Sequence, residues 1–294
     1  MFHSFRSAVM RARQHGDLYF AVLLDEQHIL EAFGPASSLW QGWIYSPAVT
    51  VWLFLAQCMS PDHSCREAVG RLAAWRVAQG LRPCSADTSA YCSARDEIPE
   101  AACRELVRRT GQELEVQTPD EWRWHGRHVR VVDGSTVTMP DTSENQAEYP
   151  QANTQKPGCG LPIARVLVVF SLAVGVVLDA TIGQYKGKQT GENSMFRTLH
   201  HLLKAGDVAL VDRCFSGWFD LALLRQRSVD TVARQHQLRS TDFRRGQRLA
   251  HDDHRLRVPK PARPAWMSPA PDRERQPARV AGLDVARAVR DVAR

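Results

Sequence analysis

The segment "VALVDRCFSG" (residues 208–217) places an aspartate directly after a short apolar run. Residues 208–211 are all apolar and include two valines, which predicts a strand buried on both faces. Asp212 then stands at the carboxyl end of that strand, where open α/β sheets bind ligands. The alternative is that Asp212 only caps the turn or helix that follows, as aspartates often do.

A second segment has the same form and favours the ligand-binding interpretation. The stretch "HGRHVRVVDGSTVTMP" (residues 125–140) contains an apolar run that leads to Asp133 and Gly134. We expect a strand that ends near Asp133. Residues 141–160 are polar and rich in turn formers, which predicts a long loop.

The order of the remaining elements indicates the fold class. It is strand, strand, strand, helix, strand, helix, strand, and three antiparallel strands that lead into βαβ units describe a ribonuclease H-like fold. We therefore expect an α+β or α/β chain whose mixed sheet follows an N-terminal helical domain. The elements expected after the long loop are strands at about 163–171 and 175–182, a helix over 191–206, the strand 208–211, a helix over 217–228 and a short strand over 230–235.

Residues 1–120 show helical periodicity. Apolar residues recur at helical spacing in 46–60 and 64–80, and a third helix is expected over 99–115. Ser64 is a suitable N-cap and Gly80 a suitable C-cap of the second of these helices.

Composition is that of an ordinary soluble protein with a basic balance. The 294 residues are 44% hydrophobic and 24% charged, with a net charge of +6. Lysines and arginines crowd residues 225–263, which fits either a solvated basic face or a surface that contacts phosphates. The seven cysteines form no Cys-x-x-Cys pair, so we expect reduced thiols and no zinc ribbon. The N-terminus lacks the apolar core of a signal peptide, and no apolar run reaches the length of a membrane span.

In the expected topology the strands that carry Asp133 and Asp212 are neighbours. Adjacent strands lie about 4.8 Å apart, so the two carboxylates could share a divalent cation. Hard oxygen ligands suit Mg²⁺ or Mn²⁺. Two such ions can activate a nucleophile and stabilise the leaving oxygen of a phosphodiester.

Three segments carry a resemblance to a known family. They are "VVDGSTVTMPDT" (131–142), "GKQTGENSMFRTLHHLLKAGDVALVDRCFSGWFDL" (187–221) and "TVARQHQLRSTDFRRGQRLAHDDH" (231–254). Together they resemble transposases of the IS4 family, the DDE enzymes of bacterial insertion sequences, and the resemblance covers about residues 20–268. It implies metal-dependent phosphodiester cleavage and strand transfer at transposon ends, with Asp133 and Asp212 as the first two catalytic acids and metal ligands.

The same resemblance implies a set of partners and a domain order. The expected partner is double-stranded DNA, both transposon ends and target. The full-length protein is expected to be a homodimer in the cytoplasm, associated with the nucleoid. The expected domains are a DNA-binding helical region (1–120), a ribonuclease H-like catalytic core (121–236), and the start of a β insertion followed by a disordered Arg/Pro/Ala-rich tail (237–294). The arginines expected to contact DNA are Arg213, Arg234, Arg239, Arg244 and Arg245.

The sequence departs from the family pattern at the third acid. In the family this glutamate lies in a motif Tyr-x2-Arg-x3-Glu-x6-Lys, but no tyrosine follows Asp212 here. Glu274 has no matching context and is not assigned. Glu192 opens a helix, where it either favours the helix dipole or binds metal. We therefore expect a C-terminally truncated transposase, and a catalytically inactive DNA-binding remnant is the alternative function.

Overall fold

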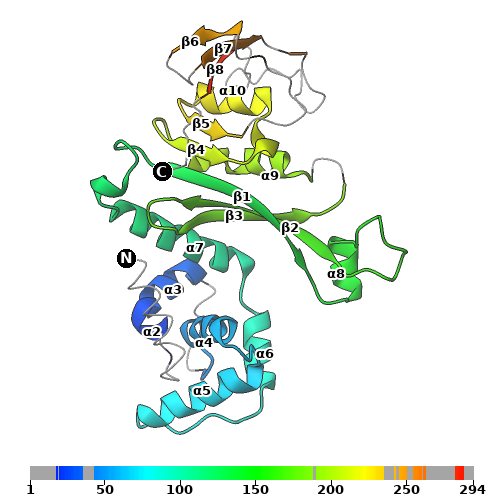
Figure 1. Ribbon diagram of the computed structural model, residues 1–294. Coiled ribbons are helices and arrows are strands. Elements are labelled where there is room, and N and C mark those ends of the chain that lie inside the picture. The colour runs from blue at the N-terminus through cyan, green and yellow to red at the C-terminus, as the bar shows by residue number, and fades with distance from the viewer. Residues whose placement is uncertain are drawn as a thin grey trace. The chain divides into compact units, whose positions relative to one another are not determined.

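The computed structural model describes residues 18, 20–35, 43–187, 190–234, 242, 245–249, 254–259, 261–262 and 282–287 (Figure 1). The chain divides into two compact units, residues 1–110 and 111–294. Each unit has hydrophobic clusters of its own.

The first unit is helical in its described part, as expected. Ser64 caps one helix as predicted, because its hydroxyl accepts a hydrogen bond from the Glu67 amide at 3.1 Å. That helix ends at Ala78 and its C-cap is Gln79, one position before the expected Gly80, which follows with a φ of 72°. The left-handed turn that ends this helix therefore needs glycine. The helices of the unit are α2 (Phe20–Leu23), α3 (Glu26–Phe33), α4 (Pro47–Met59), α5 (Cys65–Ala78), α6 (Ser89–Asp96) and the first part of α7 (Glu100–Val116).

The second unit is built on a mixed five-stranded sheet of order β3-β2-β1-β4-β5. β1 pairs antiparallel with β2, and β2 pairs antiparallel with β3. β1 and β4 are parallel, as are β4 and β5. The mixed α+β sheet expected from the sequence is confirmed. Its strands are β1 (Val129–Thr138), β2 (Ile163–Ser171), β3 (Val177–Gln184), β4 (Val208–Val211) and β5 (Asp230–Ala233).

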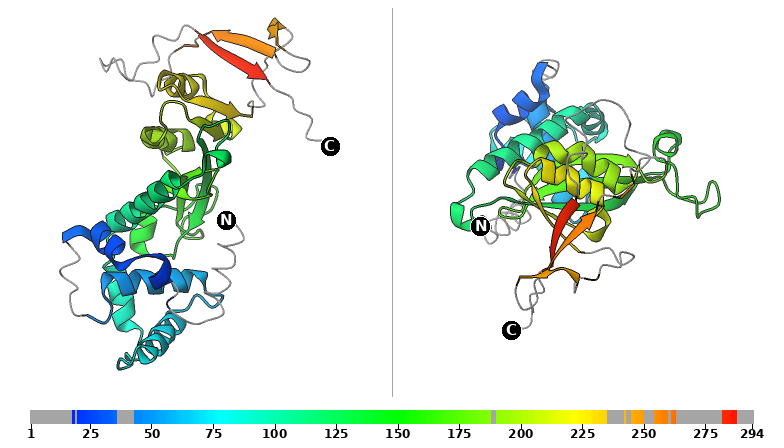
Figure 2. Two further views of the ribbon diagram at one scale, coloured as in Figure 1. Left: turned by 90° about the vertical axis from the view of Figure 1, so that its left-hand side faces the viewer. Right: turned by 90° about the horizontal axis from the view of Figure 1, so that it is seen from above.

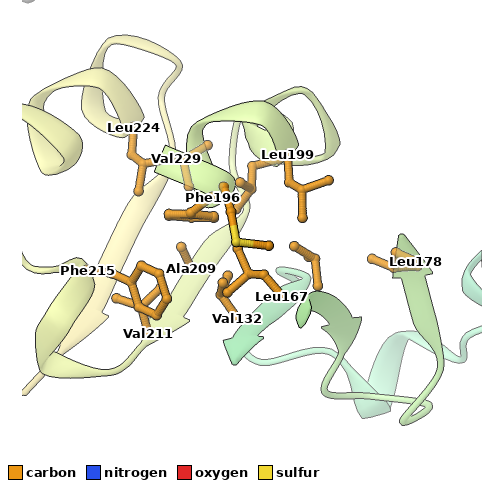
Figure 3. Packing of buried hydrophobic residues seen from close by; sticks show 13 residues of the cluster. Val132, Leu167, Leu178, Phe196, Leu199, Ala209, Val211, Phe215, Leu224 and Val229 are labelled. Atoms are coloured by element: carbon orange, nitrogen blue, oxygen red, sulfur yellow. The ribbon is translucent and has the colours of Figure 1, made fainter. Parts of the chain in front are cut away.

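Two helices cover one face of this sheet (Figure 2). α9 (Glu192–Leu199) contributes Met195, Phe196 and Leu199 to the main core, and α10 (Trp218–Gln226) contributes Leu224. Figure 3 shows Phe196, Leu199 and Leu224 packed on apolar residues of the sheet. The sheet residues in this core are Val132, Leu167, Val169, Leu178, Ala209 and Val211.

Shorter elements complete the second unit. The end of α7 packs closely on β3, since a Cβ on Gly111 would lie 2.7 Å from the Val177 carbonyl oxygen. In the C-terminal region three strands pair antiparallel in the order β6-β7-β8. The remaining elements are η2 (Asp120–Trp122), α8 (Ser143–Glu148), η3 (His200–Leu202), η4 (Arg213–Phe215), β6 (Gln247–Arg248), β7 (His254–Pro259) and β8 (Gly282–Arg287).

Two local expectations are wrong. β1 does not end near Asp133 but continues to Thr138, because β2 pairs with it along its whole length. The expected loop 141–160 contains the short helix α8, and the Thr142 hydroxyl at its N-cap accepts a hydrogen bond from the Asn145 amide at 3.2 Å.

Candidate functional site

The parallel strands place three charged residues in a row. The last register pairs are Val132 with Val211 and Val211 with Ala233. The next residue on each strand is Asp133, Asp212 and Arg234 in turn. Continuation of the register therefore puts two carboxylates and a guanidinium side by side where β1, β4 and β5 part.

Both aspartates face away from the core under α9 and α10. Val132 and Val211 belong to that core, and side chains alternate between the faces of a strand. Asp133 and Asp212 therefore project from the opposite face, and both residues are exposed. The two carboxylates share one solvent-accessible surface.

The alternative role of Asp212 as a cap is not realised. Asp212 occupies the N-cap position of η4, but its side chain makes no capping hydrogen bond. Its backbone is extended there, with φ −73° and ψ 166°. The carboxylate is thus not used to hold the turn.

A buried ion network fixes the register of β1 against β4. Arg130 is 5% exposed and forms ion pairs with Glu115 of α7 and with Asp207, the latter at 3.2 Å. Asp207 directly precedes β4, and its Oδ2 also accepts the Lys204 amide at 2.9 Å. Arg127, just before β1, donates to the Gly206 carbonyl at 2.6 Å. These contacts hold together the starts of β1, which contains Asp133, and β4, which Asp212 follows.

The protonation states in this network follow from its contacts. Burial favours the protonated form of Glu115, but hydrogen bonds from Ser171 and Arg130 outweigh it and hold the pKa of Glu115 below its usual value. Sequence reasoning missed Arg130, Glu115 and Asp207. An arginine within the apolar run "HVRVV" (128–132) was the one available signal, because a buried arginine needs an acidic partner.

A second ion pair, between α9 and α10, lies next to the turn that follows Asp212. Arg197 of α9 donates from Nε to Asp220 Oδ1 of α10 at 2.6 Å and from Nη2 to Oδ2 at 3.2 Å. Asp220 is buried, and its Oδ2 lies so close to Gly217 that a Cβ there would approach to 2.7 Å. The loop between β4 and α10 therefore has a fixed course.

Glu192 lies on the other face from the aspartates. Its carboxylate lies against Gly134, which follows Asp133 and so points to the opposite side of β1. Cys214 donates to Glu192 Oε2 at 3.5 Å, and burial together with this contact raises the pKa of Cys214 to about 12. The geometry supports a packing role for Glu192 rather than metal ligation beside Asp133.

Three of the five arginines expected to contact DNA lie in the described part of the chain. Arg213 and Arg234 are exposed, and Arg245 is exposed with Asp242 3.7 Å from its Nε. Arg239, Arg244 and the unassigned Glu274 lie outside the described residues.

Within the described ranges no group of three or more His, Cys, Asp or Glu side chains could hold a metal ion. No helix in the described part of the chain is long and apolar enough to cross a membrane.

The chain is similar to a known transposase. The chain is 25% identical over 224 residues to the transposase InsG for insertion sequence element IS4 from Escherichia coli (strain K12). The alignment covers 74% of this chain and 48% of that protein, so the chain spans about half the length of the relative it matches. No family model matches, and no solved structure matches. The resemblance to IS4-family transposases expected from the motifs around Asp133 and Asp212 is thereby confirmed.

Proposed function

We propose that this chain acts on DNA as an IS4-type transposase does, with metal-dependent phosphodiester cleavage and strand transfer at transposon ends. The observation that carries the proposal is the row Asp133, Asp212 and Arg234, which follows the last parallel register pairs of β1, β4 and β5. The similarity to InsG supports the reaction class. The strand order β3-β2-β1-β4-β5 supports a ribonuclease H-like core.

The donor set fits a hard divalent cation. Two aspartates on adjacent strands project from one exposed face, so their oxygens can converge on one ion. Mg²⁺ or Mn²⁺ binds oxygen ligands and retains water, which suits an open site of this kind. A cation bound there supplies Lewis-acid polarisation of a phosphoryl oxygen.

The residues of the chain have distinct tasks in this proposal. Asp133 and Asp212 hold the cation, and the Arg130 network keeps their strands in register. Arg234 stands next in the row, where a guanidinium pairs well with a DNA phosphate. A further carboxylate, if one takes part, must approach from the face opposite to α9 and α10.

Double-stranded DNA is the proposed partner, as transposon ends and as target. The net charge of +6 favours a polyanion, and the exposed Arg213, Arg234 and Arg245 offer phosphate contacts. The helical residues 1–120 are proposed to make part of the contacts to transposon ends. Assembly as a homodimer and residence at the nucleoid belong to the same proposal.

Metal binding tests the proposal directly. Mn²⁺ titrated into the purified chain, followed by the loss of its free-ion EPR signal, should show a site that Asp133→Asn or Asp212→Asn weakens at least tenfold. Asp120→Asn is the matched control, because Asp120 is exposed and lies outside the row. Equal Mn²⁺ affinity in all three variants would remove the shared-cation assignment. End cleavage, assayed with Mg²⁺ on transposon-end DNA, then tests the reaction itself.

A further inference from the structure

Two thiols of the first unit lie in contact. Cys65 is the first residue of α5, and Cys92 lies in α6. Their Sγ atoms are 3.8 Å apart, although 27 positions separate them in the sequence. Both residues are half-buried, so a small reagent can reach them.

Polar groups surround Cys65 in particular. Gln57 donates from Nε2 to its Sγ at 3.6 Å, and Arg95 Nη1 lies 3.8 Å from the same sulfur. The Arg95 guanidinium is held 5.9 Å from the centres of the Phe54 and Tyr91 rings. Arg95 thus places a positive charge beside Cys65 Sγ, and the thiol stands at the first position of α5.

Cys92 has a different environment. Burial, and then its hydrogen bond to Cys65, raise the pKa of Cys92 above its usual value. Of the two sulfurs, Cys65 Sγ is the one that contacts both Gln57 and Arg95. Cys65 is therefore assigned as the attacking thiol and Cys92 as the resolving thiol.

We propose that Cys65 and Cys92 form a reversible oxidation site that a low-molecular-weight disulfide such as oxidised glutathione converts into an intramolecular disulfide. The Cys65 thiolate attacks one glutathione sulfur, forms a mixed disulfide and releases one glutathione thiolate. The Cys92 thiolate then attacks Cys65 Sγ, forms the protein disulfide and releases the second glutathione thiolate. The two thiols lose two electrons and two protons, and oxidised glutathione is reduced to two glutathione molecules.

The expected product ties the start of α5 to α6. The sulfurs have to approach from contact distance to a bond of about 2.05 Å, which side-chain rotation can supply. The bond closes a loop within one compact unit, so it should restrict the unfolded chain and raise Tm. The site lies in residues 1–110 and does not depend on the proposed function.

Mass spectrometry of the full chain tests the proposal. The chain is equilibrated in glutathione buffers of increasing oxidation, alkylated under denaturing conditions and measured intact. We expect loss of two of the seven thiols without added glutathione mass, together with a higher Tm. Reduction with dithiothreitol should reverse both changes.

Substitutions assign the bridge. Trypsin leaves Cys58 in the same peptide as Cys65, and Cys84 in the same peptide as Cys92, so peptide mapping alone is ambiguous. Cys58→Ser and Cys84→Ser should keep the disulfide and its Tm increase. Cys65→Ser and Cys92→Ser should lose both and carry glutathione at the remaining thiol instead. A bridge that persists in Cys92→Ser, or a wild-type chain that gains only glutathione, would overturn the proposal.

Discussion

Glu192 occupies the space that a side chain at Gly134 would need. A Cβ on Gly134 would lie 2.9 Å from Glu192 Cδ, and Arg165 Nη1 lies 3.8 Å from Glu192 Oε1. We expect Gly134→Ala to displace the carboxylate, and because the end of a glutamate side chain can move, the free energy of unfolding should fall by about 1 kcal/mol at most. Glu192→Ala in the same chain should recover most of that loss, which urea denaturation of both single variants and the double variant measures. If the changes in free energy of unfolding of the two single variants simply add in the double variant, the two residues do not compete for space.

Removal of the Arg130 charge should destabilise the sheet strongly. Arg130→Met leaves the buried carboxylates of Glu115 and Asp207 without their shared cation, and loss of one member of a buried ion pair costs about 3–5 kcal/mol. Arg225→Ala breaks a pair with Asp230 in which the arginine side chain is 65% exposed, so it should change stability by less than about 1 kcal/mol. Thermal unfolding of both variants provides the comparison. Similar effects at the two sites would contradict the role given to the buried network.

His200 should make the second unit sensitive to mild acid. Burial, with Arg227 and Arg197 nearby, lowers the pKa of His200 to about 4 from 6.5. Above pH 6.5 the folded and unfolded states are both neutral there; as pH falls from 6.5 to 4 only the unfolded state gains the proton. Stability should therefore fall by up to about 3 kcal/mol over that window. In His200→Leu the free energy of unfolding should change less with pH between 6.5 and 5 than in the wild type. His201→Leu, at the exposed neighbour, should keep the wild-type pH dependence.

Two helix glycines should respond to alanine with opposite signs. Gly70 of α5 has open space around a built Cβ, so Gly70→Ala should stabilise α5 by about 0.5–1 kcal/mol. At Gly111 of α7 the Cβ would lie 2.7 Å from a backbone oxygen of β3, so Gly111→Ala should destabilise by about 1–3 kcal/mol. Hydrogen exchange of α5 and α7 reports each effect locally. Stabilisation at both positions would mean that α7 can move off the strand.

Arg234 should contribute one phosphate contact to DNA binding. We expect Arg234→Ala to reduce the slope of log affinity against log salt concentration by about 1. Arg234→Lys keeps the charge and should retain the slope. Fluorescence anisotropy with transposon-end DNA at several salt concentrations measures both. An unchanged slope in the alanine variant would mean that Arg234 contacts no DNA phosphate.

Local patterns predicted most of the sheet. The expected strands at 163–171 and 208–211 have those bounds in the structure, because each is a short apolar run flanked by turn residues. The end of β1 was not predictable in this way. Residues 134–138 are held in the strand by pairing with residues 163–167, and a partner so distant leaves no mark on local composition.

The candidate site was predicted only in part, because local patterns are visible in the sequence and long-range contacts are not. The positions of Asp133 and Asp212 follow from apolar runs that end in an acid. The face on which they lie depends on register, and the register depends on Arg130 and Asp207, residues 77 positions apart. Long-range ion pairs of this kind are set by tertiary packing, so single-sequence patterns indicate the buried arginine but not its partner.

The central place of β1 in the sheet has a consequence for synthesis on the ribosome. β1, β2 and β3 are consecutive in the chain and can pair as soon as they emerge, whereas the other edge of β1 waits for β4. At about 5–20 residues per second, that edge stays open for several seconds. An unpaired edge is a template for pairing with another chain. A nascent chain stalled before β4 should therefore be aggregation-prone at the edge beside which Asp212 later stands.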